Sequence, residues 1–169
     1  QMIQNISIIG LIITIGEIAL AIYKYMQETR RKKCSDTLQT INNLFNSTYS
    51  AREEYLSAFN NSTFDLEKIE SNKKIYKSTM ILLTQWESFS RGLFYNIYDF
   101  QLFIYLVPKE LSEMLDGLTK FVERERDHKN YNRLFSDFTY LSHDVSTCLQ
   151  MKLDNKKIPK RYKQIRRLK

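Results

Sequence analysis

A run of apolar residues near the start of the sequence constrains the fold most. Residues 6–23, ISIIGLIITIGEIALAIY, contain a single charged side chain, that of Glu17. As a helix, these 18 residues are just long enough to cross the roughly 30 Å hydrocarbon core of a bilayer. Tyr23 and Tyr25 stand at the end of the run, and tyrosine is enriched where membrane and water meet. The sequence therefore predicts one transmembrane helix.

The charges on either side of this run predict its orientation. No Lys or Arg precedes it, whereas the segment KYMQETRRKK follows it directly. A cleaved signal peptide normally carries its positive residues before the apolar run, so this interpretation is disfavoured. Because cytoplasmic flanks are enriched in Lys and Arg, we expect the N-terminus outside the cell and the bulk of the chain in the cytoplasm.

Small and polar residues recur along one stripe of the predicted helix, at spacings of three and four. Such spacings place side chains on one face, and small residues there let membrane helices approach closely. The stripe predicts a homo-oligomer, although these residue types are also common in membrane helices and can fall into register by chance. The residues of this contact or pore-lining face are Ser7, Gly10, Thr14, Glu17, Ala21 and Lys24.

Glu17 gives this stripe a functional hypothesis. A carboxylate exposed to lipid costs a few kcal/mol, so an intramembrane acid normally faces a partner or a water-filled cavity. In a symmetric oligomer, copies of Glu17 would form a ring flanked by Thr14, with Lys24 at the mouth, which can line a cation-selective pore. Alternatively, Glu17 is protonated and hydrogen-bonded in a closed bundle, or its side chain extends to the interface.

The rest of the sequence predicts an all-α protein, with one N-terminal transmembrane helix followed by a small cytoplasmic helical bundle. The whole chain has only four Gly and two Pro, and 43% of its residues are hydrophobic, enough for one modest core beside the membrane helix. We expect three parts: residues 1–29 as transmembrane helix and juxtamembrane region, residues 30–151 as the helical domain, and residues 152–169 as a basic tail.

Helical spacing of apolar residues places the elements of the domain. The pattern is uninterrupted from Lys24 to Phe59, so the membrane helix either continues or gives way to a new helix capped by Ser35 or Asp36. A second helix is expected to begin near Asp65.

The second half of the domain begins with an apolar segment, and two predicted helices follow it. Residues 92–107 are favoured as a buried core segment over a re-entrant or interfacial one, since Asp99 interrupts them. Pro108 fits the first turn of another helix, and a final helix is predicted over residues 130–151.

Catalytic signatures are missing from the sequence. There are two His and two Cys, without an HExxH, CxxC or GxSxG motif or a phosphate-binding glycine loop. The prediction is therefore a protein that is not an enzyme and that needs no metal or cofactor. Arg91 follows Glu87 by four residues, which predicts an ion pair on one helix face, with anion binding by Arg91 as the alternative.

The net charge of +7 arises largely from two basic clusters. Such clusters attract phosphate groups of anionic lipid, of a nucleotide or of single-stranded nucleic acid, on which Tyr162 would stack a base. A solvated tail without a ligand is the remaining alternative for the second cluster. The candidate anion-binding residues are Arg30, Arg31, Lys32, Lys33, Lys160, Arg161, Tyr162, Lys163, Arg166 and Arg167.

The order of these elements, with the segments LLTQWESFSRGLFYNIYDFQLF and FVERERDHKNYNRLFSDF, resembles a bacterial family of uncharacterised single-span membrane proteins with helical cytoplasmic domains. Some members are similar to membrane effectors of anti-phage defence. The resemblance implies a location in the bacterial inner membrane. With the stripe, it leads us to expect an oligomeric pore-forming effector that acts in antiviral defence and is gated by an anionic nucleotide or nucleic acid. The alternative is a membrane-tethered module that binds lipid, nucleic acid or a partner protein.

Overall fold

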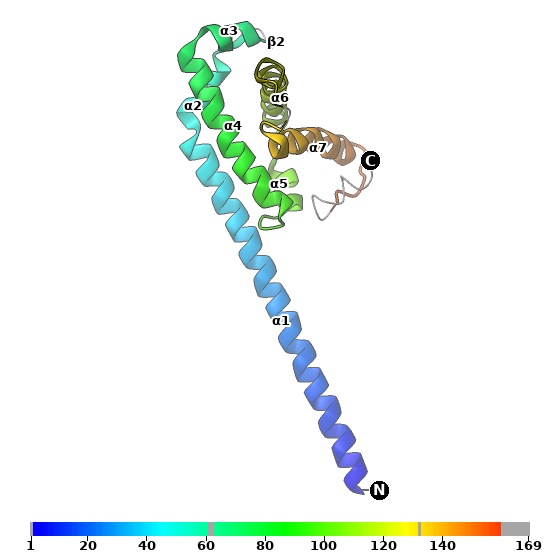
Figure 1. Cartoon of the computed structure of the whole chain (residues 1–169). Helices are drawn as coiled ribbons and strands as arrows, with labels where there is room; N and C mark the ends of the chain where they lie inside the picture. Colours follow the sequence, from blue (N-terminus) through cyan, green and yellow to red (C-terminus); the bar gives the residue numbers. More distant parts are fainter. Residues whose placement is uncertain (1, 61–62, 132, 160–169) are drawn as a thin grey trace.

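One very long helix and a bundle of shorter ones make up the structure (Figure 1). The computed structural model describes residues 2–60, 63–131 and 133–159, with the side chains of residues 16–58, 65–131 and 133–159. In this part of the chain, the only strands are a two-stranded antiparallel hairpin, so the prediction of an all-α fold is confirmed. The elements are α1 (Met2–Ser47), α2 (Tyr49–Leu56), β1 (Phe59–Asn60), β2 (Thr63–Phe64), α3 (Leu66–Ser71), α4 (Lys73–Phe94), α5 (Phe100–Leu106), α6 (Lys109–Lys129) and α7 (Ser136–Leu153).

Helix α1 is continuous over 46 residues, about 70 Å at 1.5 Å per residue. No new helix begins at Ser35 or Asp36, so the first of the two alternatives for this segment is confirmed. The first part of α1 projects away from the other elements, and its last turns pack against α2, α4 and α5 (Figure 1).

Two helices, each with its own N-cap, stand where a single helix was predicted to begin near Asp65. Asp65 caps α3 by accepting a hydrogen bond from the Lys68 amide at 3.0 Å. After two turns the chain breaks, and Asn72 caps α4 by accepting from the amides of Lys74 and Ile75. The prediction of one helix is therefore wrong, because Asn72 has an extended backbone and its side chain takes over as acceptor.

The apolar segment 92–107 forms two helices joined by a loop. It packs Leu93, Phe100 and Phe103 into the core, as predicted, but Tyr95 and Ile97 in the loop are more than half exposed. Only part of the segment therefore belongs to the core, because the loop exposes apolar side chains at the surface of the domain.

The boundaries of the last two helices also differ from those predicted. Pro108 is the residue before α6 rather than a member of its first turn. Asn130 adopts a left-handed conformation (φ 50°) that ends α6, and α7 begins at Ser136 rather than near 130.

Trp86 of α4 lies at the centre of the core. Its side chain is 1% exposed, and its ring makes edge contacts with Phe45 of α1 (6.3 Å between centroids) and Phe89 (5.8 Å). The ring of Phe103 of α5 is 6.3 Å away. This aromatic cluster joins α1, α4 and α5 and fixes the base from which the first part of α1 projects.

Candidate functional site

The projecting part of α1, here called the stalk (residues 16–32), is exposed along its whole length. Its exposed side chains include large apolar ones. Ile18, Leu20 and Ile22 are each more than half exposed, and so are Tyr25 and Met26. An apolar surface of this kind marks a site of contact with lipid or protein.

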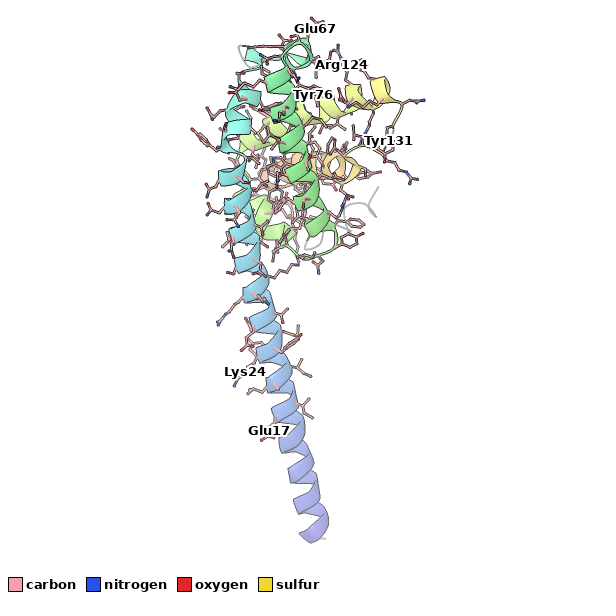
Figure 2. All side chains as sticks on the ribbon, turned by 60° about the vertical axis from the view of Figure 1, so that its left-hand side comes forward. Glu17, Lys24, Glu67, Tyr76, Arg124 and Tyr131 are labelled. Atoms are coloured by element: carbon pink, nitrogen blue, oxygen red, sulfur yellow. The ribbon has the colours of Figure 1, made fainter. Side chains whose placement is uncertain are left out.

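The structure places half of the predicted stripe on the stalk. Glu17, Ala21 and Lys24 are exposed there, and spacings of four and three keep them on one helix face. Figure 2 shows Glu17 and Lys24 on this projecting part, far from the bundle. The side chains of Ser7, Gly10 and Thr14 lie outside the described part of the chain.

The predicted transmembrane segment is only partly covered by the description. Among the residues that the structure describes, no helix combines the length and apolar character that crossing a membrane requires. Residues 6–15, more than half of the predicted segment, have side chains outside the described set.

Hydrogen bonds fasten α1, just after the end of the stalk, to the loop between α4 and α5. Thr37 of α1 is fully buried, and its hydroxyl accepts a hydrogen bond from the Asp99 amide at 2.8 Å while donating to the Lys33 carbonyl at 2.7 Å. Lys33 Nζ donates to Asn96 Oδ1 at 2.6 Å. The Cys34 thiol lies 3.8 Å from Asp99 Oδ2. The contacts with Asn96 and Asp99 join residues more than 60 positions apart, so they fix the segment of α1 that directly follows the stalk against the domain.

The shape of this loop follows from the way in which α4 ends. Asn96 takes a left-handed conformation (φ 63°), the Ile97 amide donates to the Gly92 carbonyl at 2.9 Å, and the Asn96 amide donates to the Leu93 carbonyl at 3.0 Å. This pattern is a Schellman motif, which satisfies the last carbonyls of a helix. It turns the chain sharply, and Asp99 then caps α5 by accepting from the Leu102 amide at 2.9 Å.

A groove of about 470 Å³ lies between the stalk and this loop. Here it is called the junction groove. Two of the predicted anion-binding residues, Arg30 and Lys33, line it, whereas Arg31 and Lys32 are exposed on α1 and do not. The six predicted residues of the tail, Lys160, Arg161, Tyr162, Lys163, Arg166 and Arg167, lie outside the described part of the chain. The residues lining the groove are Tyr25, Met26, Thr29, Arg30, Lys33, Asn96, Asp99 and Gln101.

The sequence indicates the cations of this groove but not its other wall. Asn96, Asp99 and Gln101 belong to a segment that the sequence marks only as apolar. The one sequence signal for this wall is Asp99, which interrupts the apolar run. In the structure, Asp99 is the N-cap of α5 and lies beside α1.

One polar cluster at the other end of the domain, formed by Tyr76, Glu125 and Lys129, is satisfied within itself. Tyr76 donates to Glu125 Oε2 at 2.9 Å, and Lys129 Nζ lies 2.5 Å from the same oxygen and 3.1 Å from the Tyr76 hydroxyl. The hydrogen bond to Glu125, followed by that to Tyr76, raises the pKa of Lys129. Figure 2 shows Tyr76 at the opposite end of the molecule from Glu17. This cluster therefore stabilises the contact between α4 and α6.

The two thiols have little nucleophilic character at neutral pH. Burial raises the pKa of Cys148 to about 12, and burial followed by the charge of Asp99 raises that of Cys34. Thiolates are the reactive and metal-binding form of cysteine. Over the side chains that the structure describes, no group of three or more His, Cys, Asp or Glu is arranged to hold a metal ion.

Comparison with known proteins identifies a family. No curated protein and no solved structure matches this chain significantly. A family model described as a domain of unknown function (DUF4760) matches residues 11–144, from within the apolar run to the middle of α7. This match covers most of the sequence, so the chain belongs to the DUF4760 family.

Proposed function

We propose that this chain is a single-span membrane protein that self-associates through α1 and conducts cations along a path lined by Glu17. In this proposal, residues 6–23 cross a bacterial inner membrane and the helical domain lies at its cytoplasmic surface. Activation by an anionic nucleotide or single-stranded nucleic acid at the basic tail, and a role in antiviral defence, belong to the same proposal. They rest on the charge of the tail and on the resemblance of the sequence to defence effectors.

One observation carries the proposal: a carboxylate stands on an exposed apolar stalk. Glu17 is followed directly by Ile18, with Leu20 and Ile22 beyond it, and all three of these apolar side chains are more than half exposed. In lipid, an isolated carboxylate at this position costs a few kcal/mol. Association of several copies with Glu17 facing a common axis removes this cost, because water and cations then solvate the carboxylates.

The rigid junction supports a role for the domain in setting the state of the pore. Since α1 continues without a break from the stalk to Phe45, which packs against Trp86, a movement of the domain moves the stalk with it. A flexible linker would uncouple the two.

The substitution Glu17→Ala is expected to reduce cation selectivity strongly. In planar bilayers containing the full-length protein, we expect the cation-to-anion permeability ratio to fall by about tenfold, since one carboxylate per copy is removed from a confined path. Glu28→Ala is the matched control, because Glu28 is an exposed acid on the same helix but beyond the apolar segment. Unchanged selectivity in Glu17→Ala, or equal loss in both variants, would exclude Glu17 from the pore.

The junction groove supports a second candidate function, a membrane-tethered binding module. In that case α1 only anchors the domain, and the groove or the tail recruits lipid, nucleic acid or a partner protein. This candidate predicts no conductance from the wild-type protein in the same bilayers. It also predicts that an unrelated monomeric span in place of residues 6–23 preserves binding.

A further inference from the structure

We propose that the junction groove binds the phosphate headgroup of an anionic phospholipid from the bilayer that α1 enters. This inference rests on the membrane-spanning part of the proposed function and not on the pore. It assigns a ligand to a site built from two segments far apart in the sequence, α1 and the loop between α4 and α5.

The end of the groove nearest the apolar segment lies at the depth of the headgroup layer. At 1.5 Å per residue, Tyr25 lies about 3 Å and Lys33 about 15 Å beyond Tyr23, the end of the apolar segment. The polar layer of a bilayer extends about 5–7 Å beyond the hydrocarbon on each side. The groove thus begins within this layer. The backbone of Arg30 lies about 10 Å beyond Tyr23 and that of Lys33 about 15 Å beyond it, both outside the layer, so their long side chains have to extend back toward the headgroups.

The chemistry of the groove suits a ligand with an apolar part and an anionic part. Tyr25 and Met26 lie nearest the apolar segment and are 71% and 64% exposed. Arg30 and Lys33 follow along the same helix, and each cation near a membrane surface contributes about fivefold to the affinity for anionic lipid. Acyl chain and glycerol therefore meet apolar side chains, and the phosphate meets two cations.

Asp99 is the acid in the groove, and its oxygens already accept hydrogen bonds. Oδ1 accepts from the Leu102 amide at 2.9 Å, and Oδ2 faces the Cys34 thiol at 3.8 Å. The amide side chains of Asn96 and Gln101 complete this wall, and each carries donors suited to phosphate oxygens. With two cations and one acid, the lining has a net positive charge.

The loop that forms this wall presents apolar side chains to the outside. Tyr95 is 64% exposed and Ile97 is 59% exposed, on a segment that joins α4 to α5. Figure 1 shows these helix ends at the side of the domain from which the stalk projects. A soluble nucleotide would leave Met26 in water, whereas the polar layer of a bilayer reaches this side chain, and the lipid is therefore the better occupant.

Native mass spectrometry of the full-length protein in mild detergent tests this assignment. Phosphatidylglycerol and phosphatidylcholine are added at equal concentrations, and bound lipids are counted. We expect preferential retention of phosphatidylglycerol, and a loss of affinity of about thirtyfold in the double variant Arg30→Gln/Lys33→Gln. The matched control Arg31→Gln/Lys32→Gln removes the same charge from adjacent positions outside the groove and is expected to retain the lipid.

A single variant and a competition with inorganic phosphate complete the test. Arg30→Gln alone keeps the contact between Lys33 and Asn96, so a partial loss of lipid in this variant shows that folding is not the cause. Equal losses in the double variant and its control would overturn the proposal in favour of general surface charge. Displacement of the lipid by millimolar inorganic phosphate would overturn the choice of a lipid as ligand.

The same preparations separate this inference from the proposed function. If the wild-type protein conducts cations but shows no preference for phosphatidylglycerol, the groove assignment alone is refuted. If the wild-type protein retains phosphatidylglycerol but conducts no cations, the pore alone is refuted.

Discussion

Replacing Glu87 by alanine is expected to lower the free energy of unfolding of the helical domain by about 3 kcal/mol. Helix α7 begins after Phe135, which has a left-handed backbone and supplies no side-chain cap. The cap comes instead from α4: Glu87 Oε2 accepts from the Phe138 amide at 2.6 Å, and Oε1 from the Asp137 amide at 3.4 Å. A carboxylate at this end also interacts favourably with the helix dipole.

Arg91 extends the same interaction. It lies 3.5 Å from Glu87 and 3.3 Å from Asp137, which confirms the ion pair predicted from the spacing of Arg91 and Glu87. Without Glu87, two amides and one cation lose their shared acceptor.

Denaturant unfolding in detergent, followed by circular dichroism, measures the effect. Glu87→Gln keeps one acceptor oxygen and is expected to cost about half as much. Glu113→Ala serves as control, because Glu113 is 62% exposed and pairs only across one turn with Lys109; a change within about 0.5 kcal/mol is expected. If Glu87→Ala destabilised no more than Glu113→Ala, the proposed cap would be wrong.

Thr37→Val is expected to cost about 2 kcal/mol, the penalty of a buried amide without an acceptor. Valine fills the same volume but leaves the Asp99 amide without the hydroxyl that it now donates to at 2.8 Å. Because Asp99 also caps α5, the loss is expected to loosen the junction between the stalk and the domain.

Hydrogen exchange locates the effect of this substitution. In Thr37→Val we expect faster exchange at the amides of residues 99–103, with little change in α6 and α7. Thr84→Val is the matched control, since the Thr84 hydroxyl also donates to the carbonyl four residues earlier but is exposed. Similar exchange at residues 99–103 in both variants would show that Thr37 does not fasten the loop.

Local sequence signals predicted the helices better than the points at which they begin, end and connect. The spacing of apolar residues and the scarcity of Gly and Pro were sufficient for the all-α fold and for the continuous α1. Asn72 carries a recognisable cap signal, but apolar spacing continues across it, so the break between α3 and α4 was missed. Leu38 continues the apolar spacing of α1 yet is 47% exposed, because the neighbouring helices cover only the other face.

The junction groove could not be predicted from local pattern. The contact between Lys33 and Asn96 joins residues 63 positions apart, and the left-handed turn at Asn96 that makes it possible depends on how α4 ends. In the same way, the cap of α7 comes from α4 and is invisible in the sequence around Phe135. The basic residues after the apolar run were identified, but only packing separates Arg30 and Lys33 from Arg31 and Lys32.

The number of copies in one complex tests the central claim most directly. The full-length protein is incorporated into lipid nanodiscs at low density, and intact complexes are weighed by native mass spectrometry. If α1 spans the bilayer and copies of Glu17 share an axis, the discs will contain a fixed number of copies greater than one. Discs that contain single copies, or a protein that does not enter discs at all, would contradict the account.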